Sequence, residues 1–162
     1  MARKNKEVYF NETLPYRSHN PLNIRYAPKV KWQGQTGRDE QGNCQFSGFS
    51  MGYRAAVMIL RSYRRRGIKR LGTIIERWAP RTASQTDAYI QSVIDTISPR
   101  YSEPYVVARN TVIDLRNREL VIQLLLAMTR VEMNANAAQM HSMRTYAEMG
   151  YDLAITSKGF WG

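Results

Sequence analysis

The sequence predicts a mainly helical α+β fold that carries one small β-hairpin. Apolar residues recur at spacings of three and four through most of the chain after residue 50, which is the period of amphipathic helices. Before that point, two short extended segments, Val30 to Gln33 and Cys44 to Ser47, flank a turn at residues 37–42 with a glycine at each end. A chain of 162 residues suits one domain with a real core, so residues 1–162 are expected to form a single domain.

The N-terminal half is expected to hold an arm, the hairpin and two helices. Residues 1–16 are polar and patternless, which is typical of a surface arm. Ser50 is a plausible N-cap for a helix that Gly67 would end. A short helix over residues 73–78 should stop before Pro80, because the residue preceding a proline avoids helical geometry.

The C-terminal half is expected to hold three more helices. Ser84 with Asp87 resembles a capping box that opens a helix running up to Ser98. After a loop over residues 99–110, Asp114 or Asn117 can cap the most apolar helix of the chain, which we expect to be central. A last helix is predicted from about Asn136 to Ile155, followed by a tail over residues 156–162.

The composition limits the kinds of partner and cofactor. Twenty-four Lys and Arg against thirteen Asp and Glu give a net charge of +11, which favours nucleic acid, an anionic membrane surface or an acidic cell-wall polymer. A single cysteine, Cys44, with only His19 and His141 makes a zinc site improbable, and no cofactor or metal is expected. Neither a signal peptide nor a transmembrane segment is predicted, so we expect synthesis in a host cytoplasm.

One acidic residue interrupts the apolar pattern of the central helix. Glu132 follows Met128 by four residues and therefore falls on the inward face, at the end of the helix. A carboxylate there is costly unless it is paired or protonated, and a protonated carboxyl group is what glycoside cleavage requires of its general acid. Glu132 is thus either a catalytic acid or one half of a structural ion pair with an arginine.

Other candidate residues carry two readings each. Asp39 and Glu40, in the hairpin turn, could supply the second carboxylate of a glycosidase, or they could be ordinary exposed turn residues. Cys44 is more simply a small buried hydrophobe than a nucleophile. A basic cluster near residue 65 suits either the negative end of a helix dipole or a binding patch; its members are Arg61, Arg64, Arg65, Arg66, Lys69 and Arg70.

Several short motifs resemble a family of small phage and prophage proteins that are often labelled virion structural proteins. The motifs include Asn20-Pro21-Leu22-Asn23-Ile24-Arg25, Trp32-x-Gly34 and Trp78-Ala79-Pro80, and the resemblance covers roughly residues 17 to 135. This sequence has Leu22 where the family has Gly, and Ala83-Ser84 where it has Glu-Asn after the Trp-Ala-Pro-Pro segment.

The first half is also similar to bacterial glucosaminidases of the flagellar and autolysin type, which have a lysozyme-like fold. Their catalytic Glu ends a helix that comes before the Asn-rich motif, whereas here the helix ending in Glu132 comes after it, as a circular permutation would arrange it. The resemblance implies that Glu132 is the acid of a peptidoglycan hydrolase. It further implies that Asn20, Asn23, Trp32 and Gln33 line the sugar groove, to which Tyr53 and Trp78 are added as candidates.

Two functions therefore follow from the sequence. The first is a phage-encoded glycan-strand hydrolase or lytic transglycosylase, acting as an endolysin or carried in the virion. The second is a non-enzymatic virion protein that binds DNA or a shell or tail protein through the basic cluster. A sequence-specific DNA regulator is disfavoured because no helix-turn-helix spacing is found.

Overall fold

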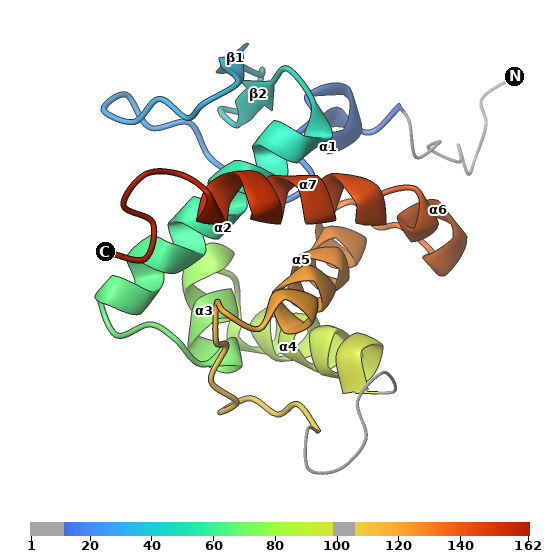
Figure 1. Ribbon diagram of the computed structural model, residues 1–162. Helices are drawn as coiled ribbons and strands as arrows, with labels where there is room; N and C mark the ends of the chain where they lie inside the picture. The colour runs from blue at the N-terminus through green and yellow to red at the C-terminus, as the bar shows by residue number, and fades with distance from the viewer. Residues whose placement is uncertain (1–11, 99–105) are drawn as a thin grey trace, which may run out of the picture.

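A computed structural model describes residues 12–98 and 106–162 of the chain. Helices dominate it, and one two-stranded sheet lies at one end of the molecule (Figure 1), as the sequence predicted. In chain order the elements are α1 Leu14–Arg17, β1 Gln35–Arg38, β2 Cys44–Phe46, α2 Phe49–Arg65, α3 Leu71–Trp78, α4 Ala83–Ile97, α5 Arg118–Glu132, α6 Ala137–His141 and α7 Arg144–Ile155.

The hairpin is antiparallel, and its first strand lies later in the chain than predicted. Gln35 pairs with Phe46 and Arg38 with Cys44, with an irregularity between Gln35 and Gly37. The predicted strand over Val30 to Gln33 is wrong, because residues 30–32 are irregular and the chain turns at Gln33 and Gly34, where the Gln35 side chain accepts a hydrogen bond from the Trp32 N–H.

Helix α5 is the centre of the molecule, as expected. It packs against α4, α6 and α7, and almost its whole length from Leu120 to Thr129 is buried. Asn117 caps it by accepting a hydrogen bond from the Leu120 N–H, which decides between the two predicted caps. The N-terminal end of this helix is thereby fixed.

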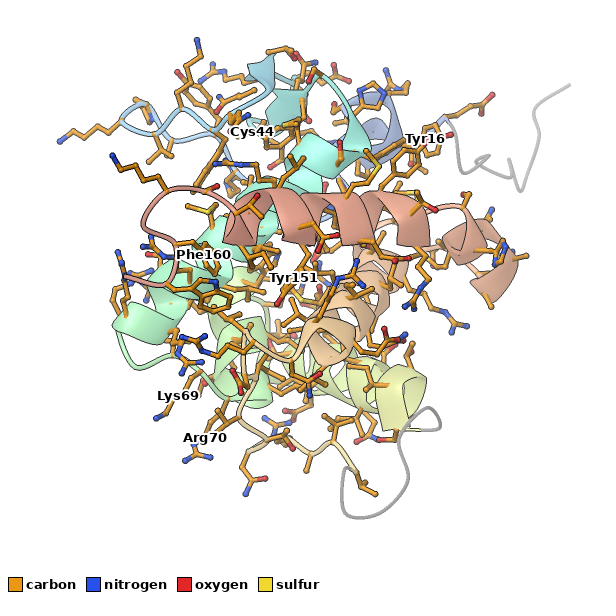
Figure 2. All side chains as sticks on the ribbon, in the orientation of Figure 1. Tyr16, Cys44, Lys69, Arg70, Tyr151 and Phe160 are labelled. Carbon is orange, nitrogen blue, oxygen red and sulfur yellow. The ribbon has the colours of Figure 1, made fainter. Side chains whose placement is uncertain are left out.

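The most extensive packing between two helices is at the crossing of α7 over α2, visible in Figure 1. A Cβ on Gly150 would lie 2.5 Å from the Tyr53 Cβ and 2.8 Å from the Arg54 nitrogen, so only glycine allows α7 to approach this closely. Figure 2 shows Tyr151 facing inward beside this crossing. Its hydroxyl donates to the Leu115 carbonyl.

Three predicted helix boundaries are wrong. Helix α2 begins at Phe49, before Ser50, and its N-cap Gly48 supplies no side-chain bond. Helix α4 has its capping box on Thr82 and Gln85 rather than on Ser84 and Asp87. The predicted last helix is two helices, because the chain turns at Ser142 and Met143 between α6 and α7.

The ends of the chain are only partly as expected. Most of the predicted arm lies outside the described residues, as does most of the predicted loop over residues 99–110, while Leu14–Arg17 form the short helix α1. In the tail, Phe160 is buried against α2. Within the described residues, no helix has the length and apolarity needed to cross a membrane.

Candidate functional site

A tight loop over residues 20–24 brings polar side chains to the end of α5. Asn20 is buried and ties the loop to the hairpin, because its amide nitrogen donates to the carbonyls of Ile24 and Cys44 at 2.9 Å each. Its amide oxygen accepts from the Ile24 N–H. The loop lies close against α2, where a Cβ on Gly52 would lie 2.6 Å from the His19 carbonyl oxygen.

Glu132 is the last residue of α5, and its side chain is only 4% exposed. The Asn23 amide donates to Glu132 Oε1 at 3.1 Å, and the Tyr89 hydroxyl donates to Oε2 at 3.0 Å. Asn23 also donates to the Glu132 carbonyl oxygen at 3.3 Å, and so supports one of the free carbonyls at this helix end. Both carboxylate oxygens therefore have a fixed direction.

Asn23 reaches this position from a left-handed backbone conformation, with φ of 52°. Asparagine tolerates this region better than most residues other than glycine. The strained residue is thus the one that contacts Glu132. Residues in strained backbone conformations are often found at functional sites.

Helix α4 supplies the other partners of Glu132. Tyr89 is buried, and burial together with the negative charge of Glu132 raises its pKa well above the usual value. Its hydroxyl is consequently a proton donor at neutral pH. Arg81, just before α4, lies 3.5 Å from Glu132 Oε1 and over the Tyr89 ring, and its side chain is 38% exposed. It covers the carboxylate from the solvent side.

The partners of this carboxylate line two open pockets. The first pocket, of about 340 Å³, is bounded by Asn23 and by an aromatic and basic wall; its other lining residues are Ile24, Arg25, Ala27, Val30, Trp32, Ile59, Tyr63, Arg77, Trp78 and Pro80. The second pocket, of about 600 Å³, has Arg81 and Tyr89 at one end and continues over Gln85, Ala88, Ser92, Arg130, Val131, Asn134, Ala135 and Asn136. Glu132 itself lines neither pocket: its partner Asn23 lines the first, and its partners Arg81 and Tyr89 line the second.

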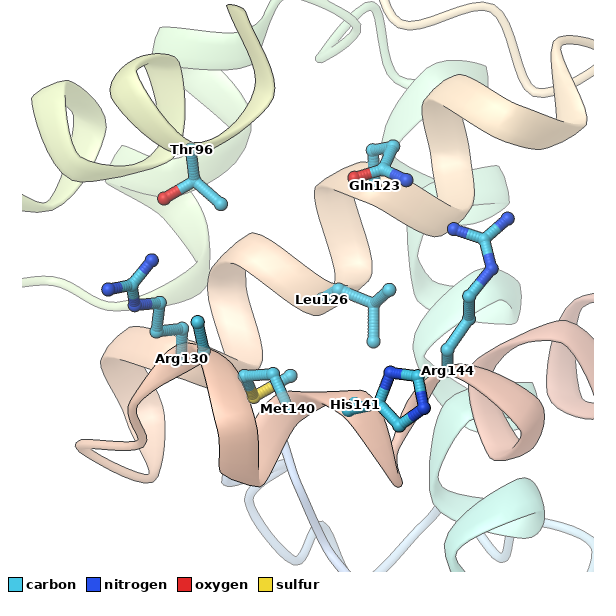
Figure 3. Close-up of a pocket in the computed structure, with 8 residues that line it drawn as sticks. Thr96, Gln123, Leu126, Arg130, Met140, His141 and Arg144 are labelled. Carbon is cyan, nitrogen blue, oxygen red and sulfur yellow. The ribbon is translucent and has the colours of Figure 1, made fainter. Parts of the chain in front are cut away.

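The second pocket leads into a longer hollow between α4 and the α5–α6 corner. It shares Ala88, Ser92 and Arg130 with a neighbouring pocket that also touches Thr96. Thr96 and Arg130 in turn border a pocket of about 260 Å³, shown in Figure 3, with Arg130 and Arg144 at opposite ends and Leu126 and His141 between them. Basic side chains therefore recur along the whole path.

The predicted substrate residues separate into two groups. Asn23, Trp32 and Trp78 line the first pocket, and the Trp78 indole N–H donates to the Leu22 carbonyl at 3.1 Å. Asn20 and Tyr53 are buried behind the site, where the Tyr53 hydroxyl bonds with Thr129 at 2.8 Å. Gln33 is exposed in the turn before β1 and lines neither pocket.

The two hairpin acids differ in their surroundings. Asp39 Oδ1 accepts from the backbone N–H groups of Gln41 and Asn43, at 2.9 and 3.0 Å, so that carboxylate holds the turn together. Glu40 is exposed. Neither residue lines the pockets beside Glu132. Cys44 is a free, buried thiol whose pKa is raised by burial and by nearby Asp39.

The predicted basic cluster does not lie on one surface. Arg61, Arg64 and Arg65 border a pocket at the C-terminal end of α2, whereas Arg66 lies over the Tyr63 ring. Lys69 and Arg70 belong to the loop between α2 and α3 and are exposed at the edge of the molecule (Figure 2), where Arg70 donates to the Asn110 carbonyl at 2.7 Å. The cluster is thus at least two separate features.

Tyr89 and Arg81 were not singled out by the sequence. Tyr89 looked like one apolar residue in the stripe of α4, and Arg81 like a loop residue after proline. The available signal was that an inward-facing Glu132 needs donors, but nothing in the spacing identifies which residues supply them. Among the described residues, no group of three His, Cys, Asp or Glu side chains converges on a metal-sized site.

Comparison with known proteins adds one phage relative. The chain is 33% identical to protein P5 of Pseudoalteromonas phage PM2 over 110 residues, which is 62% of this chain and 69% of the phage protein. It belongs to the family of that phage protein. No family model matches the chain. This similarity supports the predicted resemblance to phage proteins. It does not support the predicted resemblance to glucosaminidases.

Proposed function

We propose that this protein is a phage enzyme, carried in the virion or released at lysis, that cleaves the glycan strands of bacterial peptidoglycan. In this proposal Glu132 is the general acid. The membership in a phage protein family supports the biological setting. The chemistry rests on the site around Glu132.

The observation that carries the proposal is a nearly buried carboxylate whose hydrogen-bond partners line two open pockets. A side chain that is 4% exposed, oriented by Asn23 and Tyr89, is more than a surface ion pair requires. The single arginine contact is long, at 3.5 Å, and Arg81 is partly exposed. Such a weak contact contributes little to stability, so an ion pair alone does not account for the arrangement.

The pockets suit a polymeric, carboxylate-bearing sugar. Trp32 and Trp78 offer flat apolar surfaces of the kind that pack against sugar rings, and Asn23 offers an amide beside them. Arg25 and Arg77 on one side and Arg130 on the other give the path a positive charge. Peptidoglycan carries carboxylates on its lactyl and peptide groups, which these guanidinium groups would pair with.

The proposed reaction begins when a sugar displaces Arg81 from the carboxylate. Once Arg81 is displaced, Glu132 takes up a proton from solvent and gives it to the glycosidic oxygen, and the bond from that oxygen to the anomeric carbon breaks. A water molecule, or a hydroxyl of the same sugar, then attacks the anomeric carbon and returns a proton to Glu132. The neutral Tyr89 hydroxyl and the Asn23 amide hold the carboxylate in line during both steps.

The first testable prediction is the effect of Glu132→Gln. Glutamine has the same shape: its amide oxygen can accept from Asn23 and its NH2 group can donate to the Tyr89 hydroxyl, but it cannot give the proton to the sugar. We expect muropeptide release from purified sacculi to fall by at least about 100-fold, with an unchanged thermal unfolding midpoint. Glu76→Gln, at a half-exposed position on α3, is the matched control and should retain full activity. Undiminished release by the Glu132 variant rules out its role as the acid.

A further inference from the structure

Another pocket, which we call the arginine pocket, lies away from the Glu132 site, between the C-terminal end of α2 and the C-terminal segment. It has a volume of about 320 Å³ and is bordered by Arg61, Arg64, Arg65, Leu115, Arg116, Phe160, Trp161 and Gly162. It shares no lining residue with the two pockets beside Glu132. Four of its eight lining residues are arginines and none is acidic.

Hydrogen bonds to carbonyls hold two of these arginines in place. Arg61 donates to the carbonyl oxygens of Gly159 and Phe160, and Arg65 donates to that of Gly162 at 2.7 Å. The Gly159 and Phe160 carbonyl groups orient the Arg61 guanidinium without neutralising its charge. The positive charge of Arg61 is therefore fixed in direction beside the pocket.

The one nearby carboxylate compensates little of this charge. Asp114 lies 3.6 Å from Arg64, with both side chains about half exposed, and such pairs are weak in water. Burial, and to a smaller extent the positive charge of Arg65, lowers the pKa of Arg61. The pocket gathers cations that repel one another, which an anion would relieve.

The dipole of α2 explains only part of the cluster. Arg64 and Arg65 lie in the last turn of α2, where positive charge is favourable in any helix. Arg116 comes from the loop before α5, and its guanidinium stacks on the Trp161 ring, 4.4 Å from the centroid. Arg116 is not part of α2, so the dipole of α2 does not explain why its positive charge borders the same pocket.

Trp161 distinguishes among the anions that could bind. Trp161 is 43% exposed and lies at the edge of the arginine pocket. Exposed aromatic rings beside arginines are the pattern with which proteins hold single-stranded nucleic acid, where bases stack and guanidinium groups bind phosphates. An acidic protein segment would have no base to stack, and a wall glycan, although its sugar rings can pack on tryptophan, would bring carboxylates rather than a phosphate backbone.

We propose that this pocket binds the phosphate backbone of a single-stranded nucleic acid, with Trp161 as the stacking surface for one base. The pocket is large enough for about one nucleotide. This role is independent of glycan cleavage.

The test is binding of a fluorescein-labelled oligothymidine to the full-length protein, followed by anisotropy at several salt concentrations. The double variant Arg64→Gln/Arg116→Gln should bind at least tenfold more weakly, and its salt slope should fall by about 1.4, the value for two lost phosphate contacts on a single strand. The control Lys29→Gln/Lys31→Gln removes the same charge from an exposed loop and should change affinity much less. Trp161→Ala should weaken binding about tenfold without changing the slope.

The outcomes separate this site from general attraction by a basic protein. Equal losses in the pocket and control variants would show that net charge alone drives binding, and would overturn the proposal. So would stronger competition by poly-glutamate or by anionic lipid vesicles than by unlabelled oligonucleotide. A thermal unfolding midpoint within about 2 °C of wild type checks that the variants fold.

Discussion

Asn23 connects two parts of the site through one side chain. From its left-handed backbone it donates to both the side chain and the carbonyl oxygen of Glu132. The same residue borders the aromatic pocket. A small change at Asn23 therefore alters both where the carboxylate points and how a ligand enters.

Removing the Tyr89 hydroxyl should weaken both the fold and the site. Tyr89→Phe leaves Glu132 Oε2 without its donor, and a hydrogen bond to a charged group contributes about 1.5–3 kcal/mol. We expect the free energy of unfolding to fall by about that amount in urea titrations at pH 7, together with a loss of glycan cleavage. Tyr146→Phe, at an exposed position on α7, is the control and should stay near wild type. A Tyr89 variant as stable as that control would contradict the geometry.

Tyr53 gives a prediction about alkaline pH. Burial raises its pKa far above 10, so the folded state keeps a proton that the unfolded chain loses near pH 10. Stability from this residue is complete below pH 10 and decreases as the pH rises above it. Unfolding midpoints between pH 8 and pH 11 should fall less steeply in Tyr53→Phe than in wild type. Parallel slopes would show that Tyr53 is not the cause.

At the scale of elements, the α2–α7 crossing depends on Gly150. In Gly150→Ala the new methyl group would contact the Tyr53 Cβ and α2 backbone atoms at under 3 Å, and backbone cannot easily move away. We expect a loss of about 1–3 kcal/mol in the free energy of unfolding, the usual cost of overpacking. Gly48→Ser, at the N-cap of α2 with open space around it, should be neutral or stabilising. Similar stability for both variants would contradict this packing.

The sequence predicted elements better than it predicted their ends. Apolar periodicity identified α2, α4 and α5, because burial of one face decides where a helix forms. The caps were misplaced since Thr82 and Ser84 are equally good chemically, and only the tertiary path selects Thr82. The break between α6 and α7 carries no proline or glycine, so no local signal marked it.

The candidate site was predicted in the same partial way. Glu132 stood out because a charge on an apolar face conflicts with its surroundings, and conflict of that kind is visible in a sequence. Its partners Asn23, Arg81 and Tyr89 come from three separate segments of the chain. Only the folded chain brings them together, and their spacing along the sequence does not predict this contact.

At the scale of the whole molecule, the net charge is +11, and arginines gather in two regions of the described residues. One is the path beside Glu132, with Arg25, Arg77 and Arg130, and the other is the arginine pocket at the C-terminal end of α2. A basic surface should speed association with an anionic wall, and salt should slow it. Clearing of sacculi is therefore expected to slow markedly as salt approaches about 1 M, where the Debye length is about 3 Å.

The most direct test of the central claim is mass analysis of what purified protein releases from sacculi. The proposed role of Glu132 predicts soluble muropeptides with newly formed saccharide ends, either reducing ends or anhydro ends according to whether water or a sugar hydroxyl attacks. Both should be missing when Glu132→Gln replaces the wild-type protein. Intact glycan strands after prolonged incubation with the wild-type protein would contradict the account, and would leave a phage protein that binds without cleaving.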